Sequence, residues 1–113
     1  MSARIMIVDD EPGIVDVVQR YFALSGYEVI AARSGEEALK KISCRPDLIL
    51  LDINMPGLNG FEVAEKIREN DRHVLIFFLS DRSDKADRLQ GFQLKANDYL
   101  AKPFYPEELT ARI

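Results

Sequence analysis

The chain has 113 residues, 47% of them hydrophobic and 30% charged, which is the composition of one ordinary globular domain. A lone cysteine, Cys44, excludes an internal disulfide, and no apolar run approaches the roughly 20 residues of a membrane helix. The net charge of −4 argues against nucleic-acid binding by this segment, and with no secretory signal we expect a cytoplasmic protein that binds no membrane.

Apolar runs of strand length alternate with segments of helical period along the chain. In chain order the pattern predicts a strand at 4–8, a helix from Pro12, a strand at 27–31, a helix after Ser34, a strand at 47–52, a helix carrying Phe61, a strand at 74–79, a polar helix around 84–94, a short strand near Tyr99-Leu100 and a last helix opening at 106–109. The chain therefore consists of repeated strand–helix units.

Local signals support several helix boundaries. Pro12 suits a first helical turn because its missing N–H is not needed there, and Gly26 is a natural stop. Ser34 followed by Glu37 predicts a capping box. The residues at helical spacing that we expect to face the core are Ile14, Val17, Val18, Tyr21 and Phe22, then Ala38, Leu39 and Ile42, then Phe61, Ala64 and Ile67.

Five such units with nearly continuous apolar strands imply a parallel sheet that is covered by helices on both faces. Right-handed crossovers and the chain length favour an α/β fold with a doubly wound, flavodoxin-like five-stranded sheet of order 2-1-3-4-5. Sites in such sheets lie at the carboxyl ends of the strands, where the strand order reverses. The first and third strands flank that point, and both are followed or closed by aspartate.

Acidic residues gather at these two strand ends. Asp9 and Asp10 follow the first strand and Asp52 closes the third, so the predicted sheet brings them to one crevice. Two carboxylates about 4 Å apart repel by roughly 4 kcal/mol at an effective dielectric of 20, so three need a neutralising cation. Mg²⁺ is the natural candidate, since it prefers hard oxygen ligands. The plainer alternative is that each aspartate only caps a helix or starts a turn.

Two further strand ends carry groups suited to a phosphate. The fourth strand stops at Ser80, whose hydroxyl could hydrogen-bond a phosphoryl oxygen, and the fifth is followed by Lys102, whose ammonium could pair with an anion. Either residue alone is uninformative. Together with the acids they supply an acceptor, metal ligands, a hydroxyl and a cation, which is the set that phosphoryl transfer requires.

In order and spacing, the motifs resemble the receiver domains of response regulators in two-component signalling. The matching stretches are 7–11, 50–60, 79–80 and 98–104, and the resemblance covers essentially the whole chain. It implies that Asp52 takes a phosphoryl group from a phosphohistidine on a sensor histidine kinase or phosphotransfer protein. It also implies that Asp10, Asp52 and the main-chain carbonyl of Asn54 bind Mg²⁺, and that Asp9 acts through water.

The resemblance further implies an output. Lys102 pairs with the phosphoryl group, Ser80 is drawn toward it, and Tyr99 rotates into the space that Ser80 vacates. The surface of helix four, strand five and helix five then changes and controls an output, which we expect to be transcription, and homodimer formation on phosphorylation is left open. Such a domain is not an enzyme beyond its own phosphotransfer and dephosphorylation.

Three features qualify the resemblance. Asp81 stands where the family usually has a small residue, and we expect its charge to slow phosphoryl entry or to alter the phosphoryl group's lifetime. Lys95 stands where the family usually has glycine, so the fourth helix ends differently or is less stable. Residues 1–113 are expected to form one receiver domain cut short within its last helix, with any output domain outside this chain.

Other functions fit the residues less well. A phosphatase of the haloacid-dehalogenase type carries its nucleophile on the first strand, whereas Asp52 closes the third. A flavin carrier needs a Ser/Thr/Gly-rich phosphate cradle where residues 9–12 are acidic. A pseudo-receiver that only binds partners is the main alternative. We expect His73 to be a surface residue rather than a phosphocarrier, and Cys44 to be structural.

Overall fold

The computed structural model describes residues 3–80 and 98–101. The elements are β1 (Arg4–Val8), α1 (Pro12–Leu24), β2 (Glu28–Ala32), α2 (Gly35–Lys41), a short 3₁₀ helix η1 (Ile42–Cys44), β3 (Leu48–Asp52), α3 (Gly60–Asn70), β4 (Leu75–Ser80) and β5 (Asp98–Ala101). The helices predicted around 84–94 and from 106 lie outside the described residues. All five predicted strands and the first three helices are confirmed.

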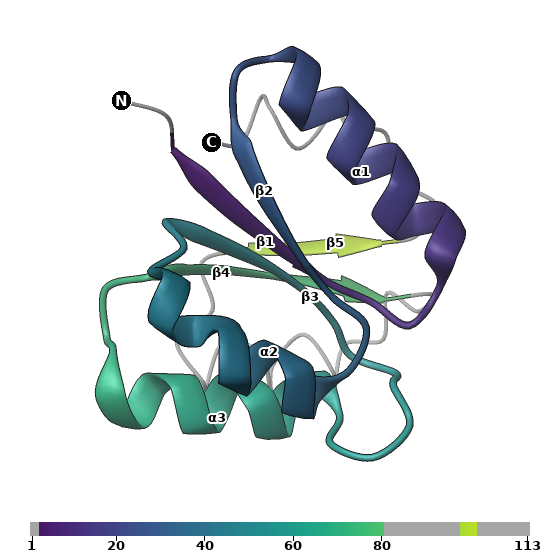
Figure 1. Ribbon diagram of the computed structural model, residues 1–113. Coiled ribbons are helices and arrows are strands. Elements are labelled where there is room, and N and C mark those ends of the chain that lie inside the picture. The colour runs from purple at the N-terminus through teal and green to yellow at the C-terminus, as the bar shows by residue number, and fades with distance from the viewer. Residues whose placement is uncertain (1–2, 81–97, 102–113) are drawn as a thin grey trace.

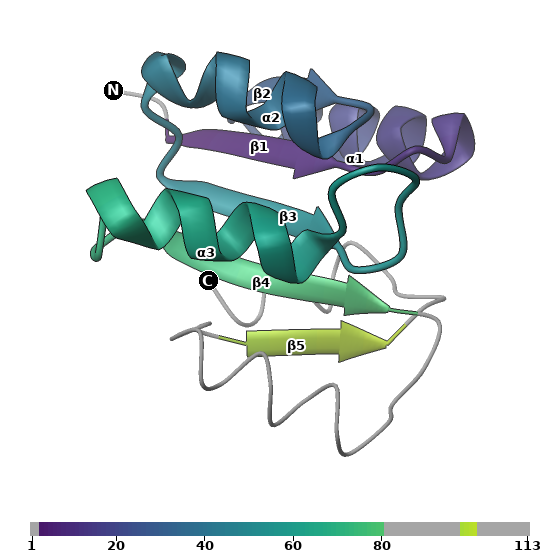
Figure 2. The same ribbon diagram turned by 90° about the horizontal axis from the view of Figure 1, so that it is seen from below.

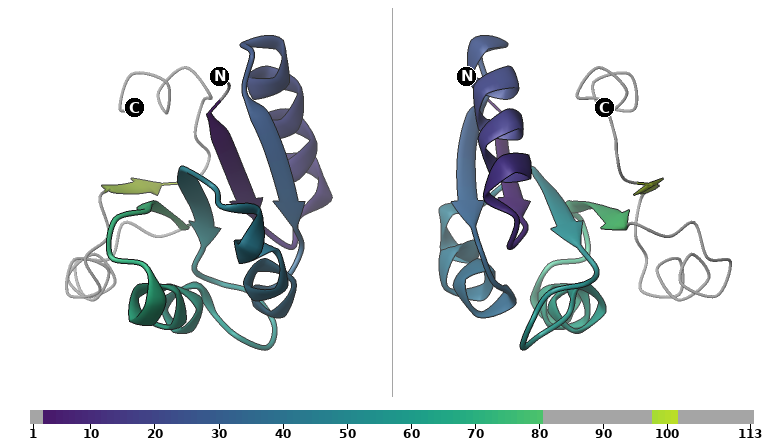
Figure 3. Two further views of the ribbon diagram at one scale, coloured as in Figure 1. Left: turned by 60° about the vertical axis from the view of Figure 1, so that its left-hand side comes forward. Right: turned by 90° about the vertical axis from the view of Figure 1, so that its right-hand side faces the viewer.

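The strands form one parallel sheet of order β2-β1-β3-β4-β5, as predicted. Helix α1 covers one face, while α2 and α3 lie together on the other (Figures 1 and 2). Figure 3 shows the same layering from the side, with α2 beside α3. Val8 of β1 pairs with Leu51 of β3, so these two strands end level with each other. The residues that follow Val8 and Leu51 are therefore carried to the same edge of the sheet.

Alternate residues of each central strand enter two separate cores. In β3, Ile49 and Leu51 join the core beneath α2 and α3, and Leu48 and Leu50 join the core beneath α1. This period of two is the geometry of an extended strand, and both sets are buried because helices cover both faces. Fully burying one such side chain stabilises the fold by about 1.5–3 kcal/mol, so the strand ends rest on a rigid platform.

The first helix buries a slightly different stripe from the predicted one. Val15, Val18 and Phe22 are its buried residues, whereas Val17 is 52% exposed and does not belong to the core. Its end also shifts the next strand. The N–H of Tyr27 donates to the carbonyl of Phe22, next to Gly26 at φ 91°. Tyr27 thus closes α1, and β2 begins at Glu28 rather than at residue 27.

The predicted capping box at α2 forms only in part. The Ser34 side chain accepts the N–H of Glu37, as expected, but the Glu37 carboxylate accepts the N–H of Arg33 rather than that of Ser34. A complete capping box stands instead at α3, where Asn59 and Glu62 each accept the other's N–H. Among the described residues, no helix is long and apolar enough to cross a bilayer.

Candidate metal centre

Three carboxylates meet at the carboxyl ends of β1 and β3. Asp9 follows Val8 and Asp52 follows Leu51, and those two residues are paired in register. One carboxylate oxygen each from Asp9, Asp10 and Asp52 lies within 4.8 Å of the others. Asp9 and Asp52 are 0% and 2% exposed, whereas Asp10 is exposed. The predicted convergence of these acids is therefore found in the structure.

Backbone hydrogen bonds extend the sheet past the strand ends and hold two of the acids. The N–H of Asp9 donates to Ala32 at 3.1 Å, and the N–H of Ile53, directly after Asp52, donates to Leu79 at 3.0 Å. Asp9 is thereby tied to β2 and Asp52 to β4. The positions of these carboxylates are set by the sheet rather than by mobile loops.

The aspartates also make local hydrogen bonds. Asp9 Oδ1 accepts the N–H of Glu11 at 2.9 Å, and Asp52 Oδ1 accepts the N–H of Asn54 at 3.3 Å. These are turn-type bonds to the residue two positions on, so the plainer alternative holds in part. Neither Asp9 nor Asp10 is the N-cap of α1, however. That residue is Glu11, whose side chain makes no capping bond.

The electrostatics of the cluster favour a bound cation. Two unit charges 4.8 Å apart repel by about 3.5 kcal/mol at an effective dielectric of 20, and three acids make three such pairs. The donor atoms are all carboxylate oxygens, the hard ligands that Mg²⁺ prefers, and the exposed position of Asp10 leaves one side of the cluster open to water. The residues present therefore fit Mg²⁺.

The other predicted site residues lie on neighbouring strand ends. Leu79 pairs with Asp52, and Ser80 pairs with Ala101, so the backbone of Ser80 stands one residue past that of Asp52 along the edge. Tyr99 pairs with Phe78 in β5. The side chains of Ser80 and Tyr99 lie outside the described part of the structure, and so do Lys102, Asp81 and Lys95 entirely. Their predicted roles remain predictions.

Two residues for which the sequence predicts no role in the site, His73 and Cys44, lie away from the acids. His73 is exposed just before β4, at the amino end of the sheet, as expected for a surface histidine. Its N–H donates to Asp71 Oδ1 at 2.8 Å. Cys44 is exposed at the end of η1, and its main-chain carbonyl accepts a 2.6 Å hydrogen bond from Arg4.

Sequence reasoning missed the residues that support the loop between β3 and α3. Glu36 of α2 accepts the N–H of Leu58 at 3.1 Å, across 22 residues of chain. Gly57 lies beside that carboxylate at φ 76°, a conformation that favours glycine. Gly60 packs against the backbone of Asp52. The glycines were visible in the sequence as a loop signal, but their contacts were not.

A parallel sheet with an acid cluster at its carboxyl edge is typical of α/β signalling domains, and comparison with known proteins agrees. The family model described as "Response regulator receiver domain" matches residues 5–113. The chain therefore belongs to the receiver-domain family of two-component response regulators. Such domains are signalling modules rather than classical enzymes, and they bind Mg²⁺ at an acidic pocket.

Relatives and solved structures support this membership. The chain is 43% identical over 114 residues to the alkaline phosphatase synthesis transcriptional regulatory protein PhoP of Bacillus subtilis, covering 100% of this chain and 48% of that protein. It is 44% identical over 113 residues to the transcriptional regulatory protein PrrA of Mycobacterium tuberculosis, covering 99% and 48%. The chain thus spans about half the length of these relatives.

The structural likeness is close. The chemotaxis protein CheY4 of Vibrio cholerae superposes with a TM-score of 0.92 at 33% identity, covering 98% of this chain and 95% of that one. The BeF3-activated DrrB receiver domain gives a TM-score of 0.92 at 31% identity, covering 99% and 94%. The flavodoxin-like fold predicted from the sequence is confirmed.

Proposed function

We propose that this chain is a phosphorylation-dependent switch that accepts a phosphoryl group on Asp52 in a Mg²⁺-dependent reaction. The donor is a phosphohistidine on a sensor histidine kinase or phosphotransfer protein. The observation that carries the proposal is the approach of three carboxylates to within 4.8 Å of one another, two of them buried, at the edge of the sheet. Membership of the receiver-domain family supports it.

The cluster divides into acceptor and ligands. Asp10, Asp52 and the main-chain carbonyl of Asn54 would hold Mg²⁺ directly, and Asp9 would act through water. When bound, the ion supplies positive charge that offsets the carboxylates and the phosphoryl oxygens. The backbone N–H of Asp9, the fully buried member, donates to the Ala32 carbonyl, and its carboxylate cannot turn away from the cluster without losing the hydrogen bond from the Glu11 N–H.

In the transfer, a carboxylate oxygen of Asp52 attacks phosphorus while the phosphorus–nitrogen bond of the phosphohistidine breaks, and the nitrogen keeps the electron pair. The product is an acyl phosphate on Asp52 and a free histidine on the donor. The N–H of Asn54 holds one carboxylate oxygen of Asp52 and so limits the rotation of the nucleophile. Lys102 would pair with the phosphoryl group and Ser80 would hydrogen-bond it.

The proposed output is a change of surface. The new phosphoryl charge draws Ser80 toward it, Tyr99 turns inward, and the surface of helix four, β5 and helix five changes what it binds, with homodimer formation as one outcome. The names of the relatives, which are transcriptional regulators, support transcription as the controlled process.

Incubation with acetyl phosphate and Mg²⁺ followed by intact-mass measurement tests the proposal. We expect the protein to gain one phosphoryl group, and we expect Asp52→Asn to abolish the gain because the nucleophilic oxygen is lost. Asp47→Asn is the matched control, since Asp47 is an exposed aspartate that accepts the N–H of Arg4 at the start of β1. A wild-type chain that gains no mass would instead be a pseudo-receiver that only binds partners.

A further inference from the structure

Gly60, the first residue of α3, lies directly against the backbone of Asp52. Its N–H donates to the carbonyl of Ile53 at 3.0 Å, and the residue is buried. A Cβ placed on Gly60 would overlap the Asp52 carbonyl oxygen, and it would lie 2.8 Å from Ile53 Cα and 3.0 Å from the Asp52 carbonyl carbon. All three neighbours are main-chain atoms, which cannot rotate aside as a flexible side chain can.

The other glycines near helix starts have different surroundings. Gly13, in the first turn of α1, has nothing within 4 Å of its Cβ position. Gly35, at the start of α2, would meet two side-chain atoms, Val63 Cγ2 at 2.5 Å and Leu58 Cβ at 2.9 Å, and one main-chain atom, the Leu58 carbonyl oxygen, at 3.0 Å. Among the glycines that the structure describes, Gly60 alone abuts the phosphoacceptor residue.

Both partners of this contact are anchored elsewhere. On one side, Asp52 pairs with Leu79 in the β3–β4 ladder and Ile53 donates to the Leu79 carbonyl. On the other side, α3 is fixed by its capping box and by buried residues along its length, which are Phe61, Val63, Ala64 and Ile67. An added methyl group would therefore have to displace either the helix start or the Asp52 backbone.

We propose that Gly60 is a positioning residue for the site: its missing side chain lets α3 lie against the Asp52 carbonyl and so sets where the Asp52 carboxylate stands relative to Asp9 and Asp10. The residue acts through Asp52 and does not itself contact metal or phosphoryl group. That Gly60 positions Asp52 follows from the contact between them. That this position matters for Mg²⁺ and the phosphoryl group rests on the proposed function.

Three variants test the inference. Gly60→Ala adds the clashing methyl group. Gly13→Ala adds a methyl group in open space at another helix start, and Ile67→Val trims a buried side chain in the same helix, so it loosens α3 without touching Asp52. The first measurement is made without Mg²⁺, by comparing the amide NMR shifts of residues 52–54. We expect displaced shifts there in Gly60→Ala and wild-type shifts in the two controls.

The second measurement is the dissociation constant for Mg²⁺ alone, by calorimetry. We expect Gly60→Ala to bind at least about tenfold more weakly, the size of effect typical when a support behind a ligand is disturbed. The dissociation constants of the two controls should stay within about twofold of the wild-type value, even if their melting temperatures fall as far as that of Gly60→Ala. A loss of Mg²⁺ affinity in Ile67→Val that matches its loss of stability would assign the effect to general loosening and overturn the inference.

The outcomes separate the inference from the proposed function. A wild-type chain that binds no Mg²⁺ overturns both. A wild-type chain that binds, with a Gly60→Ala variant of unchanged affinity and unchanged shifts at 52–54, overturns the inference alone. If Gly60→Ala does not fold, the wild type decides: a strong nuclear Overhauser effect between the α-protons of Gly60 and Ile53 supports the contact, and its absence contradicts it.

Discussion

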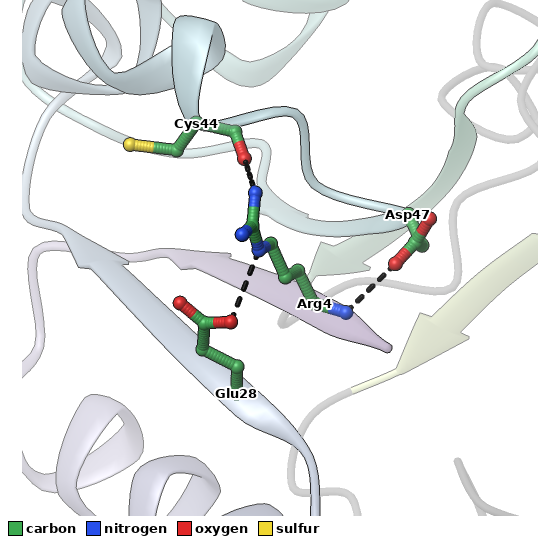
Figure 4. A network of polar contacts seen from close by, with 4 residues as sticks. All are labelled: Arg4, Glu28, Cys44 and Asp47. Atoms are coloured by element: carbon green, nitrogen blue, oxygen red, sulfur yellow. Dashed lines mark hydrogen bonds and ion pairs between the residues drawn. The ribbon is translucent and has the colours of Figure 1, made fainter. Parts of the chain in front are cut away.

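The two ends of the parallel sheet handle charge in opposite ways. At the amino end, Arg4 meets two acids and a carbonyl (Figure 4): its Nε lies 3.0 Å from Glu28 Oε2, its Nη1 lies 2.6 Å from the Cys44 carbonyl, and its backbone N–H donates to Asp47 Oδ2 at 2.8 Å. At the carboxyl end of the same strands, three carboxylates crowd within 4.8 Å. One end pairs opposite charges, and the other gathers like charges.

This difference shows where stability and function lie. The Arg4 network joins β1 to β2, to the end of η1 and to the segment between η1 and β3, so each of its contacts favours the folded chain. The acid cluster opposes folding by its mutual repulsion until a cation binds. The stabilisation from the buried cores and from the Arg4 network therefore offsets the destabilising repulsion among the three carboxylates of the metal-free site.

The largest expected effect is on metal binding. Asp10→Asn removes one charge and one ligand from the cluster, and we expect Mg²⁺ affinity to fall by about 100-fold, at the upper end of the effects seen for changes around metal sites. Asp47→Asn makes the same chemical change at the amino end and should leave the affinity within about twofold. Calorimetric titration of both variants checks this. Equal losses would mean that the two ends do not differ in cation binding.

A smaller effect, with opposite signs at the two ends, is expected for stability. In metal-free protein, Asp52→Asn should raise the free energy of unfolding by about 1–2 kcal/mol because it relieves repulsion among the acids. The gain is smaller than two full pair repulsions because water screens the exposed Asp10. Arg4→Met should lower it by about 1 kcal/mol, since the Arg4 pairs are partly exposed and screened by water. Urea denaturation with a chelator present measures both. The comparison fails if both variants shift stability in the same direction.

The smallest expected effect concerns acid. Hydrogen bonds from the N–H groups of His73 and then Val74 lower the pKa of Asp71, with minor help from the charges of His73 and Arg68. A lowered pKa contributes stability that is complete above the unfolded value near about 4 and is lost as the pH falls through the folded pKa. Asp71→Asn keeps the acceptor oxygen but takes up no proton.

As the pH falls below about 4 we therefore expect Asp71→Asn to lose less stability than the wild type, by about 0.5 kcal/mol after allowing for solvent screening. Asp16→Asn is the control, because Asp16 pairs only with the exposed Arg20 in the described contacts. Thermal melts across that pH range make the measurement. If the stability of Asp71→Asn falls with pH as steeply as that of the wild type, Asp71 does not contribute to the stability of the amino end.

Much of the fold follows from local patterns. Apolar runs of strand length predicted the strands, and Pro12 and Ser34 predicted the first two helix starts, because each reflects a local steric or hydrogen-bonding rule. The strand order followed from the right-handed crossover rule and the chain length. Single residues at the margins depend on tertiary contacts instead. Val17 has the spacing of a core residue but points to water, and Tyr27 closes α1 because its N–H reaches Phe22. Neither detail can be predicted from the hydrophobic pattern of the neighbouring residues.

The candidate site divides in the same way. Asp9, Asp10 and Asp52 could be brought together on paper, since the carboxyl ends of neighbouring parallel strands share an edge. Glu36 and Gly60 could not, because one acts across 22 residues of chain and the other is informative only once the Asp52 backbone is seen beside it. Sequence patterns thus predict the chemical groups of a site more readily than the supports that hold them.

Cys44 has a practical consequence for experiments on this protein. It is the chain's single cysteine, and its thiol is exposed beside the first residue of β1, whereas the acid cluster follows the last. At about 3.3 Å per residue, the length of β1 separates the two by roughly 15 Å. Arg4 bonds to the main-chain carbonyl of Cys44, so alkylating the sulfur spares that bond. A thiol-reactive dye or surface tether attached there would mark every molecule at one position and leave the acidic edge open to its ligands.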